Sequence, residues 1–166
     1  MSQKPDKVNI QQTIGFKLPD NTYTFKNNQA VLYALSIGFS TDPLLKSDLD
    51  FTYEISENFK VFPTFATSFL DLSYVHEAML TCPGIPEFNG LQMLHGIHGL
   101  TVHRPLKKEG TYYQRSIIED IQDKDKGALA VLKCDAYEDS ERTILALTNR
   151  MFLFVRGIGG LPSKNS

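Results

Sequence analysis

The sequence lacks several features that mark special classes of protein. Its 166 residues contain two cysteines, Cys82 and Cys134, in no recognisable motif, which favours free thiols in a reducing compartment over a disulfide framework. The 17 basic residues do not exceed the 19 acidic ones, so no excess of positive charge points to nucleic acid or an anionic membrane as the main partner. No stretch approaches roughly 18 consecutive apolar residues, so no membrane span is expected.

Linkers and targeting signals are also missing. No low-complexity tract or linker rich in Pro, Gly and Ser divides the chain, so we expect a single domain over residues 1–166. The first nine residues are polar and contain no arginine, unlike a secretory signal or a transit peptide. Residues 162–166 do not end in Ser-Lys-Leu. We therefore expect a cytosolic chain, or one whose signal was removed or lies on another chain.

Common catalytic motifs are absent as well. The sequence has no Gly-x-Ser-x-Gly elbow, no P-loop and no Gly-x-Gly-x-x-Gly after a strand. His95, His98 and His103 could suggest a metal cluster, but Gly96 and Gly99 favour a strand over a helix there. Alternation along a strand then places His95 and His98 on opposite faces, and separates His95 from His103 by about 26 Å. We expect no metal site.

The overall composition of the chain is typical of a globular domain, with 42% hydrophobic and 22% charged residues. Alternation predicts short strands near residues 22–25 and 49–54. Helical spacing predicts a helix over residues 29–37 that begins after Asn27 or Asn28 and ends at Gly38.

A long helix and a sheet are predicted after Pro63. Apolar residues recur at helical spacing from Phe65 through Phe69 and Leu72 to Met79. Four strand-like runs follow at residues 92–104, 112–122, 127–138 and 142–156, joined by short turns that should make consecutive strands antiparallel. The fold class is therefore α+β, with one long helix wrapped by a curved antiparallel sheet.

Some charged residues allow more than one interpretation. The basic residues at strand ends and in turns could pair with phosphates or could simply keep turns soluble; they are Arg104, Lys107, Lys108, Lys124 and Lys126. Asp71 and Glu77 on the long helix could act as a general base or could lie on a solvated helix face.

An ordered set of segments from about residue 12 to 160 carries a family resemblance. The matching strings are IG at 14–15, KLP at 17–19, LYAL at 32–35, FTYE at 51–54, FPTF at 62–65, LHG at 94–96, RPL at 104–106, DIQDK at 120–124 and FLFVRG at 152–157. With these, the chain resembles the N-terminal half of eukaryotic 2-enoyl-CoA hydratase 2, the hydratase unit of type 2 peroxisomal multifunctional enzymes, in the MaoC-like group. The resemblance implies a single hot-dog domain, in which the 63–80 helix is wrapped by the sheet.

The resemblance also implies what this half does not do. In the family, the C-terminal half carries Gly-Asp-x-Asn-Pro-x-His, whose Asp and His activate the water that adds to a trans-2-enoyl-CoA. Here the equivalent stretch, residues 32–43, has Gly38 and Phe39 where the catalytic Asp would begin, and no His follows. No catalytic residue is therefore expected, and the chain alone should be inactive although its family are lyases of fatty-acid beta-oxidation.

The N-terminal half accommodates substrate in the family. By resemblance, His95, Gly96 and Lys124 match positions that contact acyl-CoA. Phe65, Phe69 and Leu72 would lie near the acyl-tail pocket, although plain core packing is an alternative for these three. No cofactor is implied, because coenzyme A is part of the substrate. Family members often have Gly where this chain has Ala66, whose methyl group would narrow the tunnel.

Several interpretations stay open at this point. The chain could be the substrate-accommodating half of a hydratase, a non-catalytic structural subunit of a larger assembly such as a mitochondrial one, or an acyl-CoA thioesterase that uses Asp71 or Glu77. In each case we expect a second hot-dog domain as partner, either a copy or a catalytic chain, because an isolated sheet would leave a long edge unpaired. The resemblance implies a peroxisomal location, with mitochondrial and cytosolic ones as alternatives.

Overall fold

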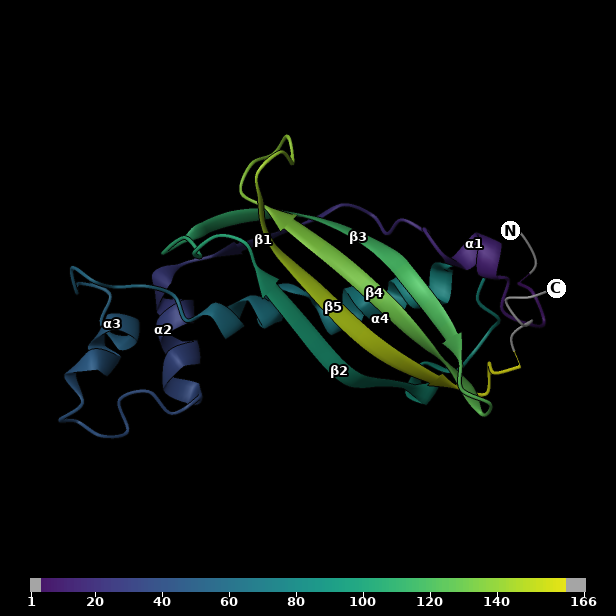
Figure 1. The fold of residues 1–166 in the computed structure, drawn as a ribbon, viewed down its shortest axis with the longest axis horizontal. Helices are drawn as coiled ribbons and strands as arrows, with labels where there is room; N and C mark the ends of the chain where they lie inside the picture. The colour runs from purple at the N-terminus through teal and green to yellow at the C-terminus, as the bar shows by residue number, and fades with distance from the viewer. Residues whose placement is uncertain (1–3, 161–166) are drawn as a thin grey trace.

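Five antiparallel strands form one sheet that curls around a helical segment in the computed structural model, which describes residues 4–160 (Figure 1). The order across the sheet is β1-β3-β4-β5-β2. The strands are β1 (Asn21–Phe25), β2 (Met93–Val102), β3 (Gly110–Asp123), β4 (Gly127–Tyr137) and β5 (Leu145–Arg156). The strand near residues 22–25 and the four later runs are thus confirmed. Residues 162–166, which were compared with the Ser-Lys-Leu targeting signal, lie outside the described residues.

Two hairpins connect β3, β4 and β5 as their turns predict. At the β3–β4 turn, the Lys124 amide donates to the Gly127 carbonyl at 2.9 Å, and Asp125 takes a left-handed φ of 63°. At the β4–β5 turn, the Asp139 carboxylate accepts from the backbone amides of Thr143 and Ile144. Side-chain and left-handed turn chemistry of this kind is what makes Asp a frequent turn residue.

The antiparallel arrangement expected of consecutive strands does not make β2 and β3 a hairpin. Strand β2 instead pairs antiparallel with β5 at one edge, while β3 lies between β1 and β4. The chain leaves β2 through backbone bonds in which the amides of His103 and Arg104 both donate to the Ala146 carbonyl, at 2.8 and 3.1 Å. The segment after β2 therefore crosses to the far side of the sheet and does not form a hairpin.

The predicted long helix is divided into two segments. A 3₁₀ helix, η2 (Pro63–Phe69), is followed by α4 (Leu72–Thr81), with Leu70 extended between them. Pro63 occupies the first turn as expected, but Asp71 accepts from the Ser73 amide at 2.7 Å and so begins a new helix. Both segments lie against the inner face of the sheet (Figure 1).

A helical lobe projects at one end of the sheet, and we call it the α2–α3 lobe (residues 27–52; Figure 1). It contains α2 (Asn27–Ser36), η1 (Lys46–Asp48) and α3 (Leu49–Thr52). The predicted 29–37 helix is confirmed, although its N-cap is Lys26, and Gly38 follows it with a φ of 103°. The strand predicted near residues 49–54 is wrong, because four residues there form a helical turn whose polar and apolar residues happened to alternate.

Two clusters make up the core on the inner face of the sheet. One packs α4 against the centre of the sheet, with Val75, Met79, Leu132 and Leu153 all buried. The other is aromatic and lies under η2, β1 and β3.

Both cysteines are buried and free, as predicted. Within residues 4–160, no helix has the length and apolar character needed to span a bilayer.

The segment before β1 contacts β3 and the C-terminal end of α4. It includes α1 (Ile10–Thr13) and an isolated bridge between Lys17 and Ile117 of β3. The Lys4 ammonium donates to the Leu80 and Cys82 carbonyls, both at 2.7 Å, near the end of α4. A cation there complements the unpaired carbonyls of a helix C-terminus.

Candidate functional site

The edge strand β2 brings two of the histidines together. His95 is aligned with Leu153 and His98 with Met151, and the register shifts between His95 and Ile97. This bulge adds one residue at Gly96, so His95 and His98 share the inner face of the sheet and their rings lie 5.4 Å apart. The predicted placement on opposite faces was therefore wrong, because strict alternation does not hold through a bulge.

His98 belongs to a hydrogen-bonded chain that reaches η2. Its Nε2 lies 2.9 Å from Oδ1 of Asn149, which is fully buried on β5. Asn149 donates from Nδ2 to the Ala66 carbonyl at 3.0 Å. Since the amide oxygen can only accept, His98 donates from Nε2, which assigns its tautomer from the network.

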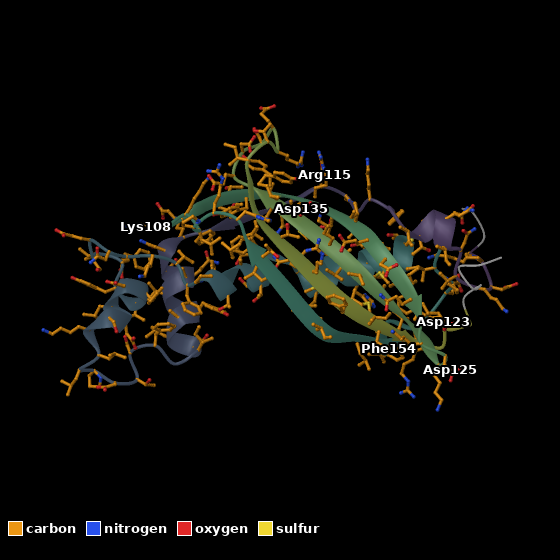
Figure 2. The ribbon with its side chains drawn as sticks, in the orientation of Figure 1. Lys108, Arg115, Asp123, Asp125, Asp135 and Phe154 are labelled. Atoms are coloured by element: carbon orange, nitrogen blue, oxygen red, sulfur yellow. The ribbon has the colours of Figure 1, made fainter. Side chains whose placement is uncertain are left out.

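Lys124 lies at the same end of the sheet as His95 and Gly96. The register aligns Gly127 of β4 with Arg156 of β5, and Val155 of β5 with Met93 of β2. The β3–β4 turn that holds Lys124 is therefore about two strand spacings, or roughly 10 Å, from the start of β2. Figure 2 shows Asp123 and Asp125, which flank Lys124, at the end of the sheet where Phe154 lies. The sequence-predicted contacts with the coenzyme thus share one end of the molecule.

A cavity of about 350 Å³ opens at this same end. Its lining includes Lys126 and Arg156, two cations from the β3–β4 turn and from the end of β5. The Gly157 amide donates to the Lys126 carbonyl at 2.9 Å, which fixes the two segments to each other. Lys126 was among the basic residues that the sequence offered as phosphate contacts, whereas Arg156 was not. The end of the last predicted strand was the signal that could have found it.

Phe65 and Phe69 lie together, whereas Leu72 lies apart from them. The two phenylalanine rings are 5.6 Å apart within η2 and are almost fully buried. Tyr23 of β1 stacks on Phe69 at 4.4 Å, and Phe25 contacts Phe65 edge to face. Leu72 begins α4 and is 54% exposed. Its side chain is therefore accessible from outside, and the two rings are held inside a packed aromatic cluster.

The two helix carboxylates, Asp71 and Glu77, lie at the surface. Asp71 caps α4 and is exposed, and Glu77 is exposed on the same helix. Among residues 4–160, no three His, Cys, Asp or Glu side chains gather where they could hold a metal ion.

The outer face of the sheet carries the best-formed ion pair. Arg150 of β5 donates from Nε to Glu119 Oε2 at 2.7 Å and from a terminal nitrogen to Oε1 at 3.1 Å. This two-pronged hydrogen bond lowers the pKa of Glu119. Burial acts in the opposite direction on Cys134, where it raises the pKa of the thiol to about 12. Neither group is poised for acid–base chemistry near neutral pH.

Most of the chain matches one known protein family. Residues 23–157 match the MFE-2 hydratase 2 N-terminal domain. The chain belongs to this family. It is 32% identical over 153 residues to the peroxisomal multifunctional enzyme type 2 of Mus musculus, covering 92% of this chain and 20% of the mouse protein. It is 33% identical to the probable enoyl-CoA hydratase 2 of Dictyostelium discoideum, covering 92% of this chain and 50% of that protein. This hydratase 2 N-terminal domain thus spans half or less of the length of these two relatives.

Solved structures confirm the hot-dog fold of this hydratase 2 N-terminal domain. A MaoC-like dehydratase from Phytophthora capsici superposes with a TM-score of 0.75 at 26% identity, covering 93% of this chain and 52% of that one. Two complexes from Mycobacterium tuberculosis show the fold alone, at 15% and 16% identity. They are the C-terminally truncated HadBC (3R-hydroxyacyl-ACP dehydratase) complex, with a TM-score of 0.58, and the ChsH1-ChsH2 complex, with a TM-score of 0.52. The matched regions cover 89% and 87% of this chain, respectively, and 98% of each of those chains.

Proposed function

We propose that this domain accommodates the acyl-CoA substrate of an enoyl-CoA hydratase 2 and supplies none of the catalytic acid–base groups. The observation that carries the proposal is the combination of family membership over residues 23–157 with the sequence of residues 32–43. That stretch contains no histidine and no Gly-Asp-x-Asn-Pro-x-His motif. General acid–base catalysis needs such groups within hydrogen-bonding reach of the reacting water.

The coenzyme part is proposed to bind at the end of the sheet that holds Lys124. Lys126 and Arg156 lie at the same end, beside the cavity described above, and together the three provide positive charge for phosphates. His95 and Gly96 lie on the adjoining edge strand. Since glycine has no side chain, the bulge there permits close approach of a ligand to the backbone.

The acyl chain is proposed to lie along η2, near Phe65, Phe69 and Leu72. Ala66, between the two aromatic rings in sequence, is fully buried and its carbonyl is held by Asn149. A methyl group in place of hydrogen at this position supports a narrower acyl path than in relatives with glycine. Binding of a bulky chain would require Phe65 or Phe69 to change rotamer.

A second hot-dog domain is the proposed partner, and strand β2 is the proposed edge. This strand has ten residues, and within residues 4–160 it pairs with β5 alone. Its Leu94 and Ile97 are 53% and 62% exposed. An exposed strand edge with apolar side chains is a template for pairing with another sheet.

The names of two relatives, from mouse and Arabidopsis thaliana, place those proteins in peroxisomes, and we propose the same location here.

The packed aromatic cluster supports a second candidate function, that of a structural subunit without ligand. Tyr23, Phe25, Phe65, Phe69 and Tyr112 fill the space beneath η2 with ring contacts of 4.4 to 6.4 Å. A filled interior leaves the acyl chain no path unless the rings move. The two candidates differ in one respect that can be measured, namely binding of acyl-CoA.

Calorimetric titration with decanoyl-CoA of the unchanged chain and of three variants tests the coenzyme site. Lys124→Gln and Arg156→Gln should each weaken binding about five- to tenfold, because each removes one charge-assisted contact with a phosphate. Lys46→Gln, in the α2–α3 lobe, removes an exposed lysine at the other end and should leave the affinity unchanged. Equal affinities in all four proteins would refute the proposed coenzyme site, and absence of binding in all four would favour the structural subunit.

A further inference from the structure

A second cavity, of about 460 Å³, lies far from the proposed coenzyme site. It is placed between the α2–α3 lobe and the end of β2, and Phe51 and Val102 contribute to its walls. Val102 is aligned with Leu147 at the start of β5, whereas the β3–β4 turn is aligned with Arg156 at the end of β5. Nine residue steps along a strand correspond to about 30 Å. The two cavities are therefore separate, and the size of this one is typical of small-molecule sites.

The charge of this second cavity is positive, opposite in sign to the net charge of -2 of the chain. Its lining includes Lys60 and Arg104 together with His103. None of the lining residues that the structure describes carries a carboxylate. Figure 2 shows a further cation, Lys108, at the same end of the molecule as the α2–α3 lobe. An anion is the ligand that such a lining attracts.

The walls that carry these cations are fixed by the backbone. The amides of His103 and Arg104 both donate to the Ala146 carbonyl. On the opposite wall, the Lys60 amide donates to the Asp50 carbonyl at 2.8 Å, and the Lys60 ammonium lies 4.9 Å from the centre of the Phe51 ring. The contact between Lys60 and the Asp50 carboxylate is long, at 3.9 Å, and 59% of the Lys60 side chain is exposed. The ammonium can therefore exchange this weak partner for a ligand at little cost.

The rest of the lining is apolar and leads toward the core. Val61 belongs to the aromatic cluster, and Leu106 packs against it. A ligand that fills the cavity would place an apolar body against these side chains and its charged group beside Lys60 and Arg104. A guanidinium fork matches the two oxygens of a carboxylate in a way that a single ammonium does not.

We propose that this cavity binds an aliphatic carboxylate, with its charged group on Arg104 and Lys60 and its chain on Phe51, Val61 and Leu106. The ligand could be a free fatty acid or the distal carboxyl group of a longer acyl chain, since both present the same chemistry. The site does not depend on acyl-CoA binding near Lys124, because it lies at the other end of the sheet.

A calorimetric titration of the chain with decanoate tests this site. Decanoate should bind, and decan-1-ol, which has the same chain without the charge, should bind at least about tenfold more weakly. Arg104→Gln should weaken decanoate binding about tenfold and Lys60→Gln several-fold. Lys46→Gln should not change it, because this exposed lysine belongs to the α2–α3 lobe beside the cavity but is not part of the cavity lining. A thermal melt of each variant confirms that the fold is kept, which we expect because both substituted side chains are exposed.

Three results would overturn the proposal. They are absence of decanoate binding, equal binding of decanoate and decan-1-ol, and unchanged decanoate affinity in both Arg104→Gln and Lys60→Gln. Competition then separates the two sources. If the mono-CoA thioester of decanedioic acid displaces decanoate and decanoyl-CoA does not, the site binds the distal carboxyl group of an acyl chain. If neither thioester displaces decanoate, the site binds a free fatty acid. Failure of decanoyl-CoA to bind near Lys124 would leave these outcomes unaffected.

Discussion

The side chain of Asn149 joins His98 on the edge strand to Ala66 in η2, with hydrogen bonds of 2.9 and 3.0 Å. Asn149 is fully buried, so no water can replace these partners if its amide is removed. The same side chain therefore sets the position of the 3₁₀ segment and the orientation of His98 on the inner face of the sheet.

Asn149→Ala should lower the free energy of unfolding by about 2–3 kcal/mol, since it leaves the buried Ala66 carbonyl without a partner and opens a small void. Chemical denaturation measures the change. Asn58→Ala, at an exposed position, should stay within about 0.5 kcal/mol of the unchanged chain. A loss for Asn149→Ala as small as that of the control would mean that the network adds nothing to stability.

The buried cysteines should be unreactive in the folded protein. The pKa of Cys134 is raised to about 12 and that of Cys82 is also raised, in both cases chiefly by burial, so thiolate is scarce at about pH 8. A thiol reagent should label neither residue of the native chain within minutes and both after unfolding. Rapid labelling of one equivalent in the native state would contradict the burial of that cysteine.

The ion pair between Glu119 and Arg150 predicts a specific pH dependence. Because the folded pKa of Glu119 lies below the usual 4.5, its contribution to stability is present above that value and is lost as the pH falls through the lowered pKa. The free-energy difference between the unchanged chain and Glu119→Gln should be below about 1 kcal/mol near neutral pH and should vanish in acid. A difference that grows in acid would have the wrong sign.

Association through β2 can be tested by a charge on the edge strand. Ile97→Lys should shift the chain toward monomer in analytical ultracentrifugation, because the lysine side chain disfavours pairing of this edge with another sheet. Leu44→Lys is the matched control, since Leu44 is 85% exposed but lies in the α2–α3 lobe. If the unchanged chain is monomeric at all concentrations, or if both variants dissociate equally, β2 is not the edge that pairs two copies.

Local signals in the sequence were sufficient for the strands and their hairpins. Alternation and turn residues predicted β3, β4 and β5, because short turns that close locally join β3 to β4 and β4 to β5. The pairing of β2 with β5 was not predictable in this way, since no turn connects the two strands and the pairing is set by the curl of the whole sheet. The break at Leu70 had a visible signal in Asp71, a good N-cap residue within the apolar stripe.

The candidate site was predicted less well than the fold. Alternation alone separated His95 from His98, although Gly96 between them was a signal for the bulge that unites them. Arg156 and Lys60 were missed because their importance comes from neighbours far away in sequence, across the sheet and across the second cavity. The roles of Phe65, Phe69 and Leu72 stay a prediction that ligand binding must test.

The most direct test of the account is calorimetric titration of the chain with decanoyl-CoA, run beside a hydration assay on trans-2-decenoyl-CoA. We expect saturable binding with no hydration, because the proposed coenzyme site lies at the Lys124 end of the sheet and residues 32–43 contain no Gly-Asp-x-Asn-Pro-x-His motif. Absence of binding would contradict substrate accommodation and leave the structural subunit. Hydration by the chain alone would contradict the claim that it supplies no catalytic group.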